Sequence, residues 1–211
     1  VDQWAAAGQE NIFGNQVVVS EMQSEAGAAG TVHGSLAAGA ITTTLQHPRS
    51  SSYDPNMYKI AAEQLPCVFD VSARTVATQS LNIFGDHSDV YACRQTGFAM
   101  LAETNPQEVM DLSPVAHLAA IEGKVPFINF FDGFRTSHEI QKIEKWDYAD
   151  LKEMCNMDAV KAFREHALTQ NIQQCVVLMK MVTYSSSTEK LVTLFTKLFQ
   201  LLLRNTWARL T

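Results

Sequence analysis

Short apolar runs alternate along most of the chain with amphipathic or small-residue stretches. The apolar, β-branched runs predict strands, and the longer stretches between them have helical spacing. The predicted strands are 17–19, 40–44, 66–73, 89–92 and 125–131. The predicted helices are 20–40, 56–64, 75–84, 105–124 and 147–166, the last holding one or two helices.

Most of these predicted strands are continuously apolar, and they alternate with helices. That pattern is typical of a parallel sheet covered on both faces. We therefore expect an α/β fold with a doubly wound, mostly parallel sheet and helices on both faces. In such folds a ligand lies beyond the carboxyl ends of the strands. Polar candidates there are Glu21 and Glu25, Arg74, and the stretch 132–138.

The predicted helix over 20–40 is rich in glycine. Glycine inside a helix costs stability, so Gly27, Gly30, Gly34 and Gly39 need a reason. Small residues at three- and four-residue spacing let another backbone come close. We expect such an approach on this helix.

Composition narrows the class of protein. A chain of 211 residues suits one domain, and 46% hydrophobic with 18% charged residues is ordinary for a globular protein. The formal charge of −6, without a long Lys/Arg cluster, argues against nucleic-acid binding. No apolar run reaches the roughly 18 residues of a membrane span. No signal peptide is visible, so we expect no membrane partner and a cytoplasmic location.

The four cysteines have no spacing typical of a metal or iron–sulfur site. We expect them to be buried or incidental thiols. The chain begins at Val1 inside domain-like sequence, so we expect a fragment that is incomplete at both ends.

Two residues are the main candidates for chemistry. Glu25 near a helix start has an ordinary explanation, since the helix dipole favours an acid there. Its functional alternative is a carboxyl group against an apolar, small-residue wall, where its pKa would rise. Arg74 ends a predicted strand, where a guanidinium can hold a carboxylate with two hydrogen bonds. Its ordinary alternative is a surface ion pair.

Other polar motifs are weaker indications of function. Thr136 and Glu139 have capping-box spacing and predict a helix start. His87, between carboxylates, favours a solvated loop histidine over a metal ligand or proton relay. The chain contains no G-x-S-x-G, Walker, H-E-x-x-H or G-x-G-x-x-G motif, so hydrolase, P-loop and dinucleotide-binding classes lack support.

Several stretches resemble one family closely over 1–44 and 55–168. They include Glu21-Met-Gln-Ser-Glu25-Ala-Gly-Ala-Ala-Gly30, Val71-Ser-Ala-Arg74 and Ile128-Asn-Phe-Phe-Asp-Gly-Phe-Arg-Thr-Ser-His-Glu139. They are similar to the first domain of pyruvate:ferredoxin (flavodoxin) oxidoreductases. The resemblance implies a thiamine diphosphate-binding domain of the pyrimidine type. It also implies part of an enzyme that converts pyruvate and coenzyme A to acetyl-CoA and CO₂, with electrons passing to ferredoxin or flavodoxin.

The resemblance also implies residue roles. The family's cofactor glutamate, which hydrogen-bonds N1′ of the aminopyrimidine, corresponds to Glu25, with Glu21 the weaker candidate. The family's substrate-carboxylate arginine corresponds to Arg74. The diphosphate and Mg²⁺ site and the iron–sulfur clusters would belong to other domains of the parent chain, so no metal ligand is expected here. The parent enzyme would be a homodimer.

Two stretches depart from the family. Residues 45–54 and 168–211 can be recoded so that a neighbouring reading frame restores family residues, and the hypothesis is a shifted reading frame in each. The domain would then extend over 1–167, with an out-of-frame tail of no native domain over 168–211. The alternative function is a non-catalytic fragment or pseudogene product that retains only the fold.

Overall fold

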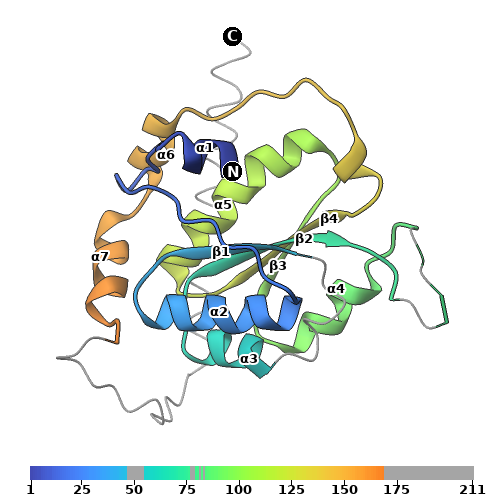
Figure 1. The fold of residues 1–211 in the computed structure, drawn as a ribbon, viewed down its shortest axis with the longest axis horizontal. Helices are drawn as coiled ribbons and strands as arrows, with labels where there is room; N and C mark the ends of the chain where they lie inside the picture. The colour runs from blue at the N-terminus through green and yellow to red at the C-terminus, as the bar shows by residue number, and fades with distance from the viewer. Residues whose placement is uncertain (47–54, 77–78, 81, 83, 169–211) are drawn as a thin grey trace.

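A single parallel sheet organises the chain. The computed structural model describes residues 1–46, 55–76, 79–80, 82 and 84–168. Its strands are β1 (Thr42–Gln46), β2 (Cys67–Ala73), β3 (Ala99–Glu103) and β4 (Phe127–Asp132). They are all parallel and lie in the order β1-β2-β4-β3 (Figure 1). The predicted α/β class with a parallel sheet is confirmed.

Helices cover both faces of this sheet (Figure 1). On one face, α2 (Glu25–Ala37), α3 (Pro55–Ala62) and α4 (Ser88–Ala92) pack through residues such as Leu36, Ile60 and Val90 onto Phe69 and Ile128. On the other face, α5 (Pro106–Gly123) packs onto Val68 and Phe127. Burial on both sides explains why β2 and β4 are almost continuously apolar in sequence. The described chain also contains α1 (Asp2–Ala6), η2 (Cys93–Gln95), η3 (Thr136–His138), α6 (Tyr148–Met154) and α7 (Met157–Glu165).

Local sequence signals set the ends of the long helices. Asn105 caps α5 by accepting hydrogen bonds from the backbone N–H groups of Gln107 and Glu108, both at 3.0 Å. Pro106 occupies the first turn, where its missing N–H costs nothing. Lys124 follows in the left-handed conformation, with φ of 53°, and so ends the helix. In α2, Ser24 caps the helix by accepting from the N–H of Gly27.

Three of the predicted elements were wrong. Val17–Val19 form no strand, and Val18 is 91% exposed; the nearest pairing is an isolated bridge between Glu10 and Gln16. Residues 89–92 belong to α4 instead of a strand. The described residues of 75–84 are not helical, because hydrogen bonds to the 84–88 loop hold the backbone there.

The expected backbone approach on α2 is not present among the described residues. A Cβ on Gly34 would meet no atom within 4 Å, and one on Gly30 would meet only the Asn56 amide, at 3.5 Å. Gly39 does need to be glycine. Its φ is +88°, and a Cβ there would lie 2.7 Å from the Ala167 Cβ. Of the glycines inside α2, only Gly34 faces open space in the described structure.

Candidate active site at the carboxyl edge of the sheet

The predicted site residues lie at the carboxyl edge of the sheet. Because the strands are parallel, Arg74, Glu103 and Asp132 all lie where a strand ends. Helix α2 leads directly into β1 and runs back along the sheet, so its first residue, Glu25, lies at the same edge (Figure 1). The predicted gathering of Glu25, Arg74 and 132–138 at one edge is therefore what the topology produces.

The connections after β2 and after β4 leave the sheet toward opposite faces. After β2 the chain turns to the face covered by α4, and Arg74 and Val76 are bonded to that helix. After β4 it crosses to the α5 face, where the Gln107 side chain pairs with the backbone of Glu144 at 2.8 and 3.1 Å. Adjacent parallel strands whose connections leave to opposite faces create a crevice at the carboxyl edge. Arg74 lies at that point.

Arg74 has an unusual set of partners. Its backbone N–H donates to Oδ2 of Asp89 at 2.7 Å, and Nη2 donates to the carbonyl of Gly133 at 3.5 Å. Its Nε is buried without a hydrogen-bond partner in the described structure. No carboxylate among the described residues forms an ion pair with it. The surface ion-pair alternative therefore finds no support in this part of the chain, and the guanidinium retains donors for an anion.

Glu25 is the first residue of α2 and is half-buried. Ala26 and Gly27 follow it, and Met22, 45% exposed, precedes it. Glu21 lies outside the helix and is exposed, so Glu25 is the better placed of the two acids.

The loop after β4 packs tightly against the end of β2. A Cβ on Gly133 would lie 2.6 Å from the Ala73 carbonyl oxygen, and one on Gly85 would overlap the Asp132 carboxylate. Oδ1 of Asp132 accepts from the N–H groups of Phe134 and Arg135. The predicted helix start at Thr136 is only the single 3₁₀ turn η3. The close packing at Gly85 and Gly133 leaves little space for the loop beside Arg74 to move.

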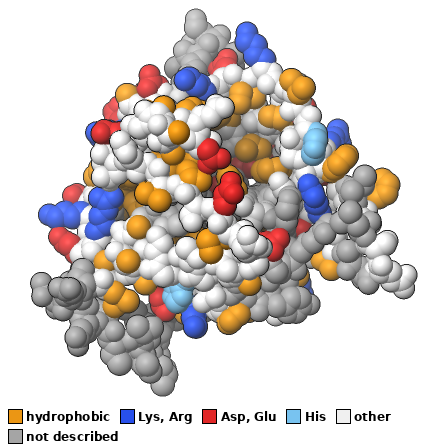
Figure 2. All heavy atoms as spheres, viewed as in Figure 1, with side chains coloured by type: hydrophobic (Ala, Val, Ile, Leu, Met, Phe, Trp, Pro, Cys, Tyr) orange, Lys and Arg blue, Asp and Glu red, His pale blue; other side chains and the backbone are white. Residues whose placement is uncertain are grey.

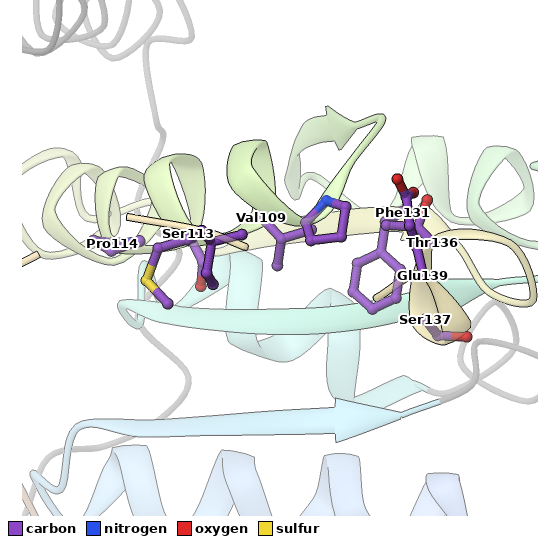
Figure 3. A pocket seen from close by; sticks show the side chains of 10 residues that line it. Val109, Ser113, Pro114, Phe131, Thr136, Ser137 and Glu139 are labelled. Atoms are coloured by element: carbon purple, nitrogen blue, oxygen red, sulfur yellow. The ribbon is translucent and has the colours of Figure 1, made fainter. Parts of the chain in front are cut away.

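Sequence reasoning missed a second concavity, which lies on the α5 side (Figure 3). It has a volume of about 490 Å³ and lies between α5 and the chain after β4. Its walls are mainly apolar, from Val109, Met110, Phe131 and Ile143. Neither Glu25 nor Arg74 lines it, so it is separate from the candidate site.

A buried acid was also missed. Glu103 ends β3 and is 4% exposed, and neither of its carboxylate oxygens has a hydrogen bond in the described structure. Burial raises its pKa to about 8, and the charge of nearby Asp70 adds to the shift, while the Asn129 amide opposes it. Asn129 donates to Asp70 at 2.9 Å. Glu103 is therefore largely protonated at neutral pH.

The remaining polar candidates do not assemble a metal site in the described chain. No group of three or more His, Cys, Asp or Glu residues there is arranged to hold a metal ion. His87 lies in the loop before α4, is half-buried and packs its ring edge-on against Phe130 at 5.2 Å between centroids. Cys67, Cys93 and Cys155 are buried free thiols, as predicted, and Cys175 lies outside the described residues.

The surface agrees with the charge analysis. On the face shown in Figure 2, Lys and Arg side chains lie apart and form no continuous basic patch. Among the described residues, no helix has both the length and the apolar character needed to cross a bilayer.

The parallel sheet with helices on both faces defines an α/β domain, in which the connections after the adjacent strands β2 and β4 leave to opposite faces. A family model described as pyruvate flavodoxin/ferredoxin oxidoreductase, thiamine diphosphate-binding, matches residues 1–195. The chain belongs to this family.

Three curated relatives are similar over most of the chain. The pyruvate-flavodoxin oxidoreductase of Enterobacter agglomerans is 63% identical over 169 residues, which are 80% of this chain and 14% of that protein. The pyruvate:ferredoxin oxidoreductase of Moorella thermoacetica is 61% identical over 168 residues, 79% of this chain and 14% of that protein. The pyruvate dehydrogenase [NADP(+)] of Cryptosporidium parvum is 54% identical over 168 residues, 79% of this chain and 9% of that protein.

The chain thus spans only 14% or less of the length of these relatives. Their names give three different electron acceptors, although this region is similar in all of them.

Proposed function

We propose that this chain is the thiamine diphosphate-binding part of an oxidoreductase that decarboxylates pyruvate with coenzyme A to acetyl-CoA and CO₂, with electrons passing to ferredoxin or flavodoxin. The observation that carries the proposal is Arg74, a guanidinium without an acid partner in the described structure, at the crevice of a domain of this family. Glu25 at the same edge supplies the second group.

Glu25 would bind the cofactor. Thiamine diphosphate supplies an electron sink for the carbon left when CO₂ departs. The support for this role is the position of Glu25 as the half-buried first residue of α2, followed by the small residues Ala26 and Gly27. The carboxyl group of Glu25 would hold and exchange a proton with N1′ of that ring.

Arg74 would bind the substrate. Its two Nη groups can hold the pyruvate carboxylate with parallel hydrogen bonds, and its buried Nε adds a donor that has no partner in the described chain. The rigid Gly133 loop beneath it would keep the guanidinium in one place. Orientation of this kind is worth several kcal/mol to a reaction barrier.

In this proposal, the other groups that the reaction needs are held by parts of the parent polypeptide outside this sequence. Mg²⁺ and iron–sulfur clusters would be held by other domains of the parent polypeptide, which would act as a homodimer in the cytoplasm. The support is the length of the relatives, of which this chain spans 14% or less.

Replacing Arg74 with Ala is expected to raise the pyruvate KM of a complete enzyme containing this domain by about 100-fold, because a charge-assisted pair is worth roughly 1.5–3 kcal/mol. Steady-state kinetics with a dye acceptor measures it. Arg94→Ala is the matched control, because Arg94 is exposed and its guanidinium bonds, within the described part of the chain, only the carbonyl of Tyr91. An Arg74→Ala enzyme with the normal KM would remove Arg74 from the site.

The shifted-frame hypothesis for 45–54 and 168–211 stays a proposal. Leu45 and Gln46 continue β1, with Leu45 71% exposed, and Leu168 bonds the carbonyl of Ala37; residues 47–54 and 169–211 lie outside the described structure.

Resequencing the DNA for 40–60 and 165–211 is expected to reveal missing bases that restore family residues. If the bases confirm the present sequence, the non-catalytic alternative is favoured, because the altered segment begins inside β1, at Leu45.

A further inference from the structure

Asp89 is the most deeply buried acid near the candidate site. It lies in α4, is 1% exposed and has no ion-pair partner among the described residues. Its Oδ2 accepts the backbone N–H of Arg74 at 2.7 Å, and its Oδ1 accepts the N–H of Val90 at 2.6 Å. Burying a carboxylate without a cation is expensive, so the bond to Arg74 needs an explanation.

The position of that bond is informative. Among the described residues, pairing between β1 and β2 extends to Gln46 opposite Val71, so the N–H of Arg74 lies beyond the last described partner on β1. Asp89 supplies the missing acceptor from a different element. Its neighbour Ser88 accepts the N–H of Val76 at 3.2 Å. The backbone N–H groups of Arg74 and Val76 are thus both hydrogen-bonded to side chains at the start of α4.

A second fastening comes from the opposite side. The N–H of Gly133 donates to the carbonyl of Ala73 at 2.8 Å, and Nη2 of Arg74 donates to the carbonyl of Gly133. The β4 loop therefore holds the residue before Arg74 and the tip of its side chain, while Asp89 holds the Arg74 backbone itself. Among the partners named here, Asp89 is the buried acid, at 1% exposed.

We propose that Asp89 is the positioning residue for Arg74, fixing the end of β2 so that the guanidinium faces the crevice. The inference rests on the proposed function, in which Arg74 binds the substrate carboxylate. Asp89 touches neither substrate nor cofactor and acts only through the Arg74 backbone. A displacement of about 1 Å at a binding group can cost about 100-fold in rate, so removal of the carboxylate should be felt in substrate binding.

The test is a comparison of Asp89→Ala with Val90→Ala in a complete enzyme containing this domain. Val90 is the next residue, is fully buried, and carries no polar group, so its variant reports loss of α4 packing alone. Asp89→Ala is expected to raise the pyruvate KM about tenfold while kcat changes less than about threefold, the pattern of lost uniform binding. Val90→Ala is expected to lower stability with KM unchanged.

If Asp89→Ala does not fold, Asp89→Asn tests the positioning role of Asp89 instead. Asparagine keeps the shape and one acceptor oxygen, but its NH₂ faces a backbone N–H. Its KM is expected to lie between those of wild type and Asp89→Ala. Amide hydrogen exchange of 74–76 in this chain is expected to speed up in Asp89→Asn more than in Val90→Ala. Normal KM and normal exchange in Asp89→Asn would overturn the proposal.

A double variant separates the two hypotheses. If Asp89 acts through Arg74, adding Asp89→Ala to Arg74→Ala is expected to leave KM as it is in Arg74→Ala alone. Additive effects on KM would refute the positioning role while leaving Arg74 in the site. If Arg74→Ala itself has the normal KM, the proposed function fails first.

Discussion

Replacing Glu25 with Gln in a complete enzyme containing this domain is expected to abolish pyruvate-dependent reduction of ferredoxin or flavodoxin, a loss of about 10²–10⁴-fold. Glutamine has nearly the same shape and fills the same place at the start of α2, but it cannot exchange a proton with the aminopyrimidine. Glu25 is half-buried in the first turn, next to the Ser24 cap. The expected loss is in kcat, because the proton transfer belongs to the chemical step.

Glu21→Gln is the matched control. Glu21 belongs to the same motif, yet it is exposed and precedes the helix, so its variant is expected to keep near-normal activity. Thermal unfolding of both variants shows whether the domain is intact. Losing the acid at the start of α2 is expected to cost only about 0.3–1 kcal/mol, the usual helix-dipole contribution. Near-normal turnover in Glu25→Gln would end its assignment as the cofactor glutamate.

The sequence predicted the buried elements well and the exposed ones badly. The runs at 66–73 and 125–131 became β2 and β4 because helices bury both faces of the central strands. Val17–Val19 has the same β-branched character but no described strand beside it. Strand formation depends on a partner, which local pattern cannot supply. The edge strand β3, only partly buried except at Glu103, gave too weak a signal to predict.

The residues of the candidate site were likewise only partly predictable from the sequence. Strand ends placed Arg74 at the carboxyl edge from pattern alone, whereas its role and that of Glu25 came from family resemblance. Asp89 was read as part of a strand, and its role became visible only when the fold brought α4 to the end of β2. Contacts between elements distant in sequence leave no periodic trace. The pKa of Glu103, set by burial under neighbouring elements, could not be predicted for the same reason.

Replacing Glu103 with Gln is expected to stabilise the chain in alkaline solution and to remove part of its pH dependence. The pKa of Glu103 is raised from 4.5 to about 8 in the fold. Below pH 4.5 both states are protonated, and the group has no effect. Between pH 4.5 and 8 the unfolded state loses its proton while the folded state keeps it. The free energy of unfolding therefore falls as pH rises, by about 1.4 kcal/mol per pH unit, and levels off above pH 8.

Denaturant unfolding of the chain at several pH values between 5 and 9 measures this slope. At pH 8 the Glu103→Gln variant, whose amide side chain is neutral throughout, is expected to be about 2–4 kcal/mol more stable than wild type. Glu108→Gln is expected to act with the opposite sign, although it also removes a charge that raises the Glu103 pKa. Hydrogen bonds from Thr104 lower the Glu108 pKa, so that group favours the fold once the pH exceeds its unfolded pKa, and its loss removes stability there. If Glu103→Gln and wild type keep parallel stability curves from pH 5 to 9, the Glu103 carboxyl is not held protonated in the fold, and water must reach the space beneath α5.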